Sequence, residues 1–375
     1  MSPGALGDFV QTPGTVEFDA VHTFSVVRQT LTMFRRALAV AGAPAPLPWA
    51  WNSAANTDPL DVHAHGLPDT MNAYYSRTAK ALKFGHFIVP SSAPPRRVFT
   101  CRSFDIVAHE TGHAVLDGLK PNWILSSAPP QTGGLHESFG DLTAIFLALS
   151  QLDQVEAVIA QTRANLHDKS FLSDLAEEFG LALGRANGLR NADNNLKLSE
   201  VSTEVHAISQ VFTGAIYDIL ADLFALERRT PSKDDAAVLY DVSQYLLGLV
   251  LRALIASPAS NAQYADVANK MISIATSDGK PASYRNAIRN RFVLREVVVA
   301  PVAFAADADT GELVAANPDT DGTVQDRSGC CGTLQHEEYL DAAQYVDSEL
   351  AELKRLFAKD LGTKPASRQQ PGTAE

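Results

Sequence analysis

Apolar residues recur at three- and four-residue steps through much of the chain, which is the spacing of one face of an α-helix. Residues 18–40 show this spacing first. They predict an amphipathic helix whose apolar side carries Phe24, Val27, Leu31, Phe34 and Leu38. Gly42 and the prolines that follow it end the pattern.

The segment after this helix has a mixed pattern. Asp61–Leu67 predicts a short extended piece, and Asp69 is placed to cap a helix that runs to about Leu82. Phe84–Val89 predicts a strand, because Pro90 ends it and a pair of prolines follows. We therefore expect a small α/β region in the first third of the chain.

Helical patterns dominate from residue 103 onward. Ser103–Leu119 predicts a long helix that Ser103 or Asp105 caps, and Leu135–Leu149 predicts the next one. Four further apolar runs continue the helical pattern, at 171–183, 203–226, 236–256 and 262–276. The end of the chain changes character: we expect strands around a tight turn at 293–316, a closing helix at 335–360 and a disordered tail at 363–375.

Composition places the chain among soluble globular proteins, with 46% hydrophobic and 20% charged residues. Its 375 residues fit one large domain or two lobes. The net charge of -12 comes without a long run of one sign, which argues against a nucleic-acid surface of clustered Lys and Arg. The three cysteines are too few for a disulfide framework, and we expect adjacent Cys330 and Cys331 to be ordinary thiols rather than a metal or redox pair.

The sequence also bears on membranes and location. The first ten residues lack the basic stretch and apolar run of a signal peptide. We find no apolar segment of the length that a bilayer requires. We therefore expect the chain as given to be cytoplasmic, without a membrane partner; a secreted location is the alternative if the chain is a processed fragment.

A candidate metal site lies inside the helix predicted at 103–119. Two histidines, His109 and His113, are four residues apart, so on a helix they point the same way and can share one zinc ion. Glu110 borders them and can take a proton from a metal-coordinated water. The motif should occur by chance in about one chain of this length in a hundred. Its apolar flanks favour a true site, because they anchor the helix while the histidines face a cleft.

The next predicted helix offers further ligands. A tetrahedral catalytic zinc needs a third protein ligand, and Glu137 and Asp141 share one face of that helix. We assign Glu137 as the third ligand and Asp141 as the acceptor of a ring N–H of His109. Two alternatives stay open: His136 as the ligand, or two solvated carboxylates at a helix start, where acids favour the dipole.

These residues resemble a known family. The run Asp105–Asp117, followed by Glu137–Asp141, looks like the zinc helix and the next helix of thermolysin-like metallopeptidases, the gluzincins. Val205–Tyr217 is similar to the family's downstream helix, which opens with a histidine near the reacting carbonyl. Weaker similarities extend over about residues 60–295: 61–63 with 72–75 resemble a strand-to-helix piece, and 264–268 and 284–288 resemble the closing helices.

The resemblance implies an α+β fold. It is a two-lobe zincin, with a small mixed α/β N-terminal lobe, a mainly helical C-terminal lobe and the zinc helix between them. The divisions expected for this chain are 1–120 for the first lobe with the zinc helix, 121–295 for the helical lobe, 296–362 for C-terminal strands and a helix, and 363–375 for the tail.

The resemblance also implies roles for individual residues. One zinc ion would be held by His109, His113 and Glu137, and Glu110 would be the general base. His206 would stabilise the tetrahedral oxyanion. An acidic partner is expected for His206, and Glu200 and Glu204 are both candidates.

The chain departs from the family at several points. His136 replaces the Asn that usually precedes the third ligand, and residues 121–134 contain no tyrosine to act near the oxyanion. The stretch before the zinc helix is short, and Phe84–Val89 is the expected remnant of the edge strand that binds peptide backbone. Acid-rich calcium loops are not evident, so calcium is not expected.

The sequence thus predicts a thermolysin-like zinc metalloendopeptidase that acts on a peptide or protein substrate through a zinc-activated water, with Glu110 as base. The alternative is a non-proteolytic binding or assembly protein that retains the gluzincin metal site. A weaker third hypothesis is hydrolysis of another small amide. Substrate specificity and oligomeric state are not indicated by the sequence.

Overall fold

A computed structural model gives the fold and describes residues 7–40, 47–52, 58–89, 94–176, 188–228, 233–299 and 313–319. All of them belong to one compact unit, Met1–Glu337. The predicted closing helix at 335–360, the predicted tail at 363–375 and the Cys330–Cys331 pair lie outside the described residues.

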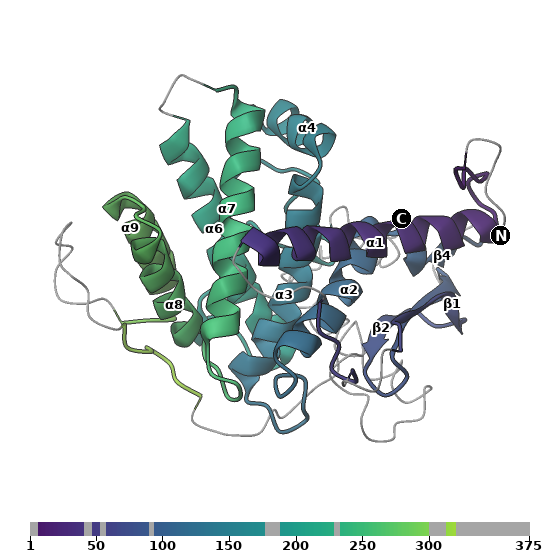
Figure 1. Cartoon of the computed structure of the whole chain (residues 1–375), viewed down its shortest axis with the longest axis horizontal. Helices are drawn as coiled ribbons and strands as arrows, with labels where there is room; N and C mark the ends of the chain where they lie inside the picture. Colours follow the sequence, from purple (N-terminus) through teal and green to yellow (C-terminus); the bar gives the residue numbers. More distant parts are fainter. Residues whose placement is uncertain are drawn as a thin grey trace, which may run out of the picture. The chain divides into compact units, whose positions relative to one another are not determined.

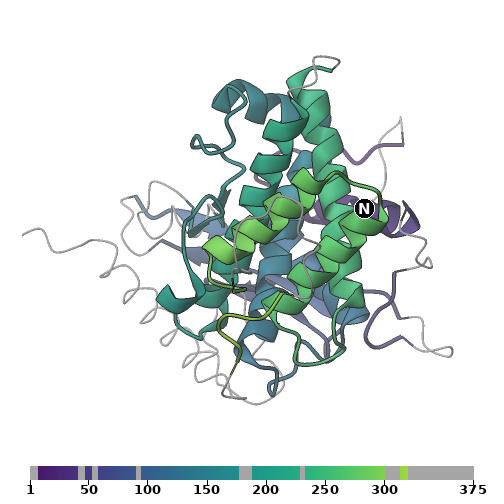
Figure 2. The ribbon, with the colours of Figure 1, turned by 90° about the vertical axis from the view of Figure 1, so that its left-hand side faces the viewer.

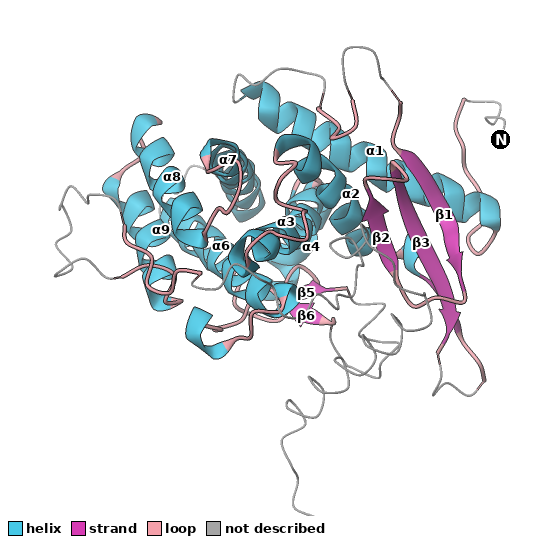
Figure 3. Ribbon diagram, turned by 90° about the horizontal axis from the view of Figure 1, so that it is seen from below, coloured by secondary structure: helices cyan, strands magenta, loops and turns pink. Residues whose placement is uncertain are grey.

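The first part of the chain forms a helix and a small sheet. Helix α1 (Val16–Val40) precedes strands β1 (Asp61–Pro68), β2 (Ala73–Ser76), β3 (Ala81–Ile88) and β4 (Arg97–Phe99). The sheet path is β1-β3-β2, and β4 pairs with β3 beyond it. Strand β1 runs parallel to β3, whereas β2 and β4 are antiparallel to it. Figure 3 shows β1, β3 and β2 side by side, with β2 nearest the helices.

The helix predicted from Asp69 to about Leu82 is wrong. Asp69 has a positive φ of 53° and sits in a turn, and the residues after it form β2, a turn and the start of β3. The pairing of Tyr75 with Leu82 stabilises the hairpin. Tyrosines favour strands when a partner strand is present, and this pairing outweighs the local helical spacing. The strand expected at 84–89 is therefore part of the inner strand β3, and β2 lies at one end of the path, with β1 at the other.

The helical part follows in the predicted order. It comprises α2 (Phe104–Leu119), α3 (Pro130–Leu149), α4 (Leu152–Thr162), α6 (Val205–Glu227), α7 (Asp235–Ala256), α8 (Tyr264–Ser277) and α9 (Ala282–Leu294), with single-turn 3-10 helices η1 (Thr100–Arg102) and η2 (Leu198–Glu200). Helix α3 begins five residues before the predicted Leu135, because Pro130 occupies its first turn. Figure 1 shows these helices along the chain, and Figure 2 shows α8 and α9 in front of α6 and α7.

The helix predicted at 171–183 is wrong over its described part. Residues 171–173 form a turn, and strand β5 (Asp174–Leu175) pairs with strand β6 (Arg190–Asn191) in an antiparallel ladder. Ala176 has a positive φ of 52°, a backbone conformation that a helix does not adopt. Of the strands expected at 293–316, the described part shows one antiparallel bridge, between Val298 and Ala315.

Helix α3 is the core of the helical part and packs against both α2 and α6. Every residue of α3 is buried. Its contact with α2 depends on small residues: a Cβ added at Gly112 would lie 2.5 Å from Oγ1 of Thr143. The helix that carries His109, Glu110 and His113 and the helix that follows it are thereby held close together.

Among the helices that the structure describes, two have by themselves the length and apolar composition of a membrane span, contrary to our expectation from the sequence. They are α6 and α7, with mean hydropathies of 1.3 and 1.5 over the most apolar window. The fold buries 83% and 61% of those windows. Packing within the protein thus covers most of the α6 window and a smaller share of the α7 window.

Candidate metal and catalytic site

Helix α2 brings three site residues together. The rings of His109 and His113 lie 4.6 Å apart between centroids and are nearly perpendicular, at 89°. Glu110 joins them, so that one ligand atom from each of the three residues lies within 4.8 Å of the others. All three side chains are buried. The i, i+4 spacing on one helix therefore produces a group that could hold a metal ion.

Glu137 of α3 approaches the same point. Its Oε2 lies 3.5 Å from Nε2 of His109, and its Oε1 lies 3.6 Å from Nε2 of His113. Two ligand atoms bound to zinc at about 2.0–2.1 Å with tetrahedral angles are about 3.3 Å apart. Both distances are thus close to those of a ligand set and too long for hydrogen bonds.

The burial and pairing of the ligand atoms are typical of a metal site. Nε2 of His109 and Nε2 of His113 are buried and have no hydrogen-bond partner among the residues that the structure describes, and Oε2 of Glu137 is buried beside them with an ion-pair contact to Nε2 of His206 at 3.0 Å. Buried polar atoms without a partner are costly and rare. A metal ion bound by all three would account for this cost, and two imidazoles with a carboxylate suit zinc.

The charges of the three groups are set by their surroundings. Burial alone would neutralise His109, but the hydrogen bond to Asp141 and the nearby carboxylate of Glu137 outweigh it and raise the pKa of His109 to about 10. Burial holds the pKa of His113 well below its usual value. Burial opposes ionisation of Glu137, but the charge of His206 and the contact with His109 outweigh it, so the pKa of Glu137 lies well below its usual value. The site thus contains an ionised carboxylate and one neutral imidazole.

Asp141, one turn beyond Glu137 on α3, contacts His109 on the Nδ1 side of its ring, away from Nε2. Its Oδ1 lies 3.0 Å from Nδ1 of His109. Arg190 of β6 donates two hydrogen bonds to the Asp141 carboxylate, at 2.6 and 3.1 Å. Our reading of the sequence missed Arg190. No local motif marks it, because the β5–β6 ladder brings it to Asp141 from 49 residues away.

Glu110 is fixed by the sheet. The backbone N–H of Tyr75, in β2, donates to Oε2 of Glu110 at 2.9 Å. Glu110 is fully buried. The sequence pattern predicted a helix where the structure has strand β2. This strand therefore orients the Glu110 carboxylate, which we expect to act as the general base.

His206 lies in the first turn of α6 and contacts Glu137. Its Nε2 lies 3.0 Å from Oε2 of Glu137. Its Nδ1 lies 2.8 Å from Oε1 of Glu204, which is also the N-cap of α6 and accepts from the backbone N–H of His206 and Ala207. Of the two acidic partners left open by the sequence, the structure places Glu204 beside His206, while Glu200 accepts from the backbone N–H of Lys197.

His136 lies away from the converging atoms. Its Nδ1 is 2.7 Å from Nδ1 of His113, and the two rings stack at 4.8 Å. His136 therefore contacts His113 from the side opposite to Nε2. Glu137, not His136, stands beside the Nε2 atoms of the two motif histidines.

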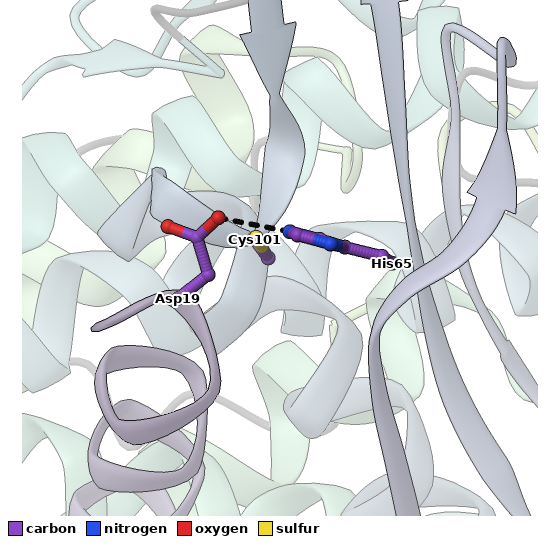
Figure 4. Close-up of side chains that lie close together, drawn as sticks. All are labelled: Asp19, His65 and Cys101. Carbon is purple, nitrogen blue, oxygen red and sulfur yellow. Dashed lines mark hydrogen bonds and ion pairs between the residues drawn. The ribbon is translucent and has the colours of Figure 1, made fainter. Parts of the chain in front are cut away.

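Two other groups of ligand-type residues are already paired. Asp19, His65 and Cys101 lie together where α1 meets the sheet, with Nε2 of His65 2.8 Å from Asp19 (Figure 4). Arg102 binds both carboxylate oxygens of Asp19, and burial raises the pKa of the Cys101 thiol to about 12. The second group is His167, Asp193 and Asp218, in which Arg295 pairs with Asp218. In both groups a carboxylate is already paired with an arginine, which is typical of structural contacts rather than of metal centres.

Comparison with known proteins bears on the fold. No protein-family model matches the chain, and no curated protein matches it. Among solved structures it is similar to the precursor of protealysin, a metalloproteinase from Serratia proteamaculans, with a TM-score of 0.50 and 15% sequence identity. The match covers 78% of this chain and 84% of that chain. The predicted α+β, thermolysin-like metalloproteinase fold is thereby confirmed.

Proposed function

We propose that this chain is a zinc-dependent metallopeptidase that hydrolyses peptide bonds of peptide or protein substrates. One observation carries the proposal: five side chains from three helices converge on one point. They are His109, Glu110 and His113 of α2, Glu137 of α3 and His206 of α6. The fold similarity to a metalloproteinase precursor supports it.

The residues that would hold zinc are His109, His113 and Glu137. A zinc ion bound there would supply Lewis acidity toward a water molecule and a substrate carbonyl. Asp141 keeps the Nδ1 side of His109 hydrogen-bonded, so Nε2 is the atom presented to the metal. Arg190 in turn holds Asp141. The protein thus contributes ligands whose ring orientation is fixed before a metal binds.

Glu110 would act as the general base. Its carboxylate borders the two histidines, and its Oε2 is held by the Tyr75 N–H. In this position it would remove a proton from the attacking water and later transfer it to the leaving amine. His206 would donate a hydrogen bond from Nε2 to the oxyanion, with Glu204 stabilising its charged form from Nδ1.

Strand β2 would align the substrate. Among the described strands it ends the sheet path, and it contacts α2. A peptide that added to this side of the sheet would run past Glu110 and the metal ligands. The alternative of a non-proteolytic binding protein fits a shortened substrate edge, and β2 would provide such an edge strand beside the site.

A comparison of two variants tests this proposal. Zinc-loaded protein is incubated with a diverse peptide library, and cleavage is read by mass spectrometry with and without a chelator. We expect cleavage that chelation abolishes, and we expect Glu110→Gln to lower it by a factor of about 10²–10⁴ while zinc remains bound. Glu17→Gln, an exposed change on α1, is the matched control. Undiminished cleavage in Glu110→Gln would reject the assignment.

A further inference from the structure

Tyr75 of β2 contacts helix α2 at two points. Its backbone N–H donates to Oε2 of Glu110 at 2.9 Å, and its hydroxyl donates to Oδ2 of Asp117 at 2.7 Å. Glu110 and Asp117 are seven residues apart, which is close to two helical turns, so both carboxylates lie on the same side of α2. Strand β2 runs beside that helix (Figure 3). One residue of the strand is thus fixed along two turns of the helix that carries the proposed base.

Asp117 occupies a costly position. It lies in the last turn of α2 and is fully buried. An acidic side chain is unfavourable at a helix C-terminus, where the macrodipole is negative, and the burial of a carboxylate adds a further cost. The reaction proposed above assigns no step to this carboxylate. Its position therefore requires compensating contacts, and the hydroxyl of Tyr75 provides one of them.

Arg77 provides the opposite charge. It directly follows β2 and donates from Nε to Oδ2 of Asp117 at 2.9 Å, and its terminal NH2 group bonds the other oxygen, Oδ1. The same guanidinium donates to the backbone carbonyl of Pro121, just beyond the end of α2. A carboxylate held at both oxygens has a fixed orientation. Oδ2 of Asp117 is therefore presented to the hydroxyl of Tyr75 in one direction.

The ring of Tyr75 is enclosed between α2 and the segment at residues 47–52. It is fully buried, and the ring of Trp51 lies 6.3 Å from it between centroids. Trp49 stacks on Trp51 in turn, at 5.5 Å. Burial and the charge of Asp117 raise the pKa of Tyr75, so its hydroxyl keeps the proton and remains a donor. Because the ring has little room, a displacement of the hydroxyl would also displace the backbone of the same residue.

We propose that Asp117 and the Tyr75 hydroxyl are positioning groups of the proposed catalytic site, because they hold the Tyr75 N–H against Glu110. The inference rests on the proposed peptidase function for the role of Glu110 as base. Without the contact at Asp117, β2 would stay paired with β3, but its separation from α2 would no longer be fixed. Glu110 would then lose the donor that orients its carboxylate. A misplacement of about 1 Å at a catalytic group can lower the rate by about 10²-fold.

The hold on the Tyr75 N–H can be measured without turnover. NMR of full-length zinc-loaded protein with isotope-labelled tyrosine gives the amide hydrogen exchange of Tyr75 and of its neighbour Tyr74, which pairs with Lys83 in the β2–β3 ladder. Asp117→Asn leaves one acceptor oxygen for two donors and places an amide NH2 beside the guanidinium. We expect this variant to speed exchange at Tyr75 about tenfold or more, and at Tyr74 by less than about twofold.

A second group of tyrosine, aspartate and arginine provides matched controls. The hydroxyl of Tyr245, on α7, donates to Asp278 at 3.1 Å, and Arg252 binds both oxygens of that carboxylate. Asp278→Asn should leave the exchange of Tyr75 unchanged, and Tyr245→Phe should leave peptide cleavage unchanged. Tyr75→Phe removes one hydroxyl in the same way, and we expect it to lower kcat about tenfold or more while zinc affinity stays constant.

Three results would overturn the inference. They are unchanged exchange of Tyr75 in Asp117→Asn, equal acceleration at Tyr74 and Tyr75, which would mean that the carboxylate supports the hairpin as a whole, and a kcat of Tyr75→Phe equal to that of Tyr245→Phe. If Asp117→Asn does not fold, Tyr75→Phe with labelled tyrosine and phenylalanine gives the same exchange comparison. If wild-type protein cleaves no peptide, the proposed function fails, and the exchange rates still decide whether Asp117 holds the N–H at position 75.

Discussion

The Nδ1 atoms of His113 and His136 lie 2.7 Å apart in the buried contact between α2 and α3. One proton occupies that hydrogen bond. A histidine that binds metal through Nε2 carries its proton on Nδ1, so His113 is the donor in the metal-bound state and His136 the acceptor. His136 then carries its own proton on Nε2, which is buried without a hydrogen-bond partner among the described residues. His136 thus orients His113 at the cost of one unsatisfied N–H.

This relationship predicts how substitutions at position 136 affect zinc binding. His136→Leu removes the acceptor, and we expect zinc affinity to fall about 10–100-fold. His136→Asn supplies an amide oxygen as acceptor and should retain most of the affinity. Competition with a chromophoric chelator measures both values, and thermal unfolding of the metal-free variants reports on folding. Unchanged zinc affinity in His136→Leu would show that His136 does not position His113.

The pKa of His109 makes zinc binding depend on pH. It is raised from 6.5 to about 10: burial opposes the charged ring, and the hydrogen bond to Asp141 together with the nearby Glu137 carboxylate outweighs burial. Because the folded value exceeds the unfolded one, the proton on His109 stabilises the metal-free fold fully below pH 6.5. This contribution is lost as the pH rises through about 10. Zinc has to displace that proton.

We therefore expect the apparent zinc affinity to rise about tenfold per pH unit between about pH 7 and 9. Chelator competition at several pH values checks the slope, and calorimetry in buffers of different ionisation enthalpy counts the released proton. Asp141→Asn removes a carboxylate that raises the pKa of His109, so it should flatten the dependence. A slope that is zero in wild-type protein, or unchanged in Asp141→Asn, would contradict this account.

The parts of this site that depend on helical spacing could be predicted from the sequence. Four residues make about one turn, so the direction shared by His109 and His113 follows from the helix alone. Arg190 and the N–H of Tyr75 could not be predicted in this way, because pairing between distant segments brings them to Asp141 and Glu110. The same cause explains the error at residues 69–82. Strand β2 is stabilised by its ladder with β3, and the local pattern does not contain that partner.

Glu204 has two roles, as the cap of α6 and as the partner of His206, and different measurements can separate them. Its carboxylate caps α6 and contacts Nδ1 of His206. Glu204→Ala should lower the free energy of unfolding by about 0.5–2 kcal/mol through loss of the cap. It should also lower kcat while zinc affinity stays constant, because His206 loses its orienting partner. Chemical denaturation, peptide cleavage and chelator competition measure the three quantities. Glu200→Ala, which alters a carboxylate outside α6, serves as the control, and a matching loss of kcat in it would contradict the role of Glu204.

Gly140 permits α3 to pass close to the ring of His109. A Cβ at this position would lie 2.6 Å from Cε1 and Nδ1 of that ring, closer than any ordinary contact. Gly140→Ala must therefore displace the ring or the helix. We expect it to destabilise the protein by about 1–3 kcal/mol and to weaken zinc binding, because His109 leaves its position between Asp141 and the metal.

Gly248 offers the matched change in α7, since a Cβ there would meet nothing within 4 Å. Replacing a helical glycine by alanine in open space removes an entropic cost of about 0.5–1 kcal/mol. Gly248→Ala should accordingly stabilise the fold and leave zinc affinity unchanged. Denaturant unfolding and chelator competition on both variants compare the two sites. If Gly140→Ala binds zinc as tightly as Gly248→Ala does, close packing of α3 on His109 is not what fixes the ligand.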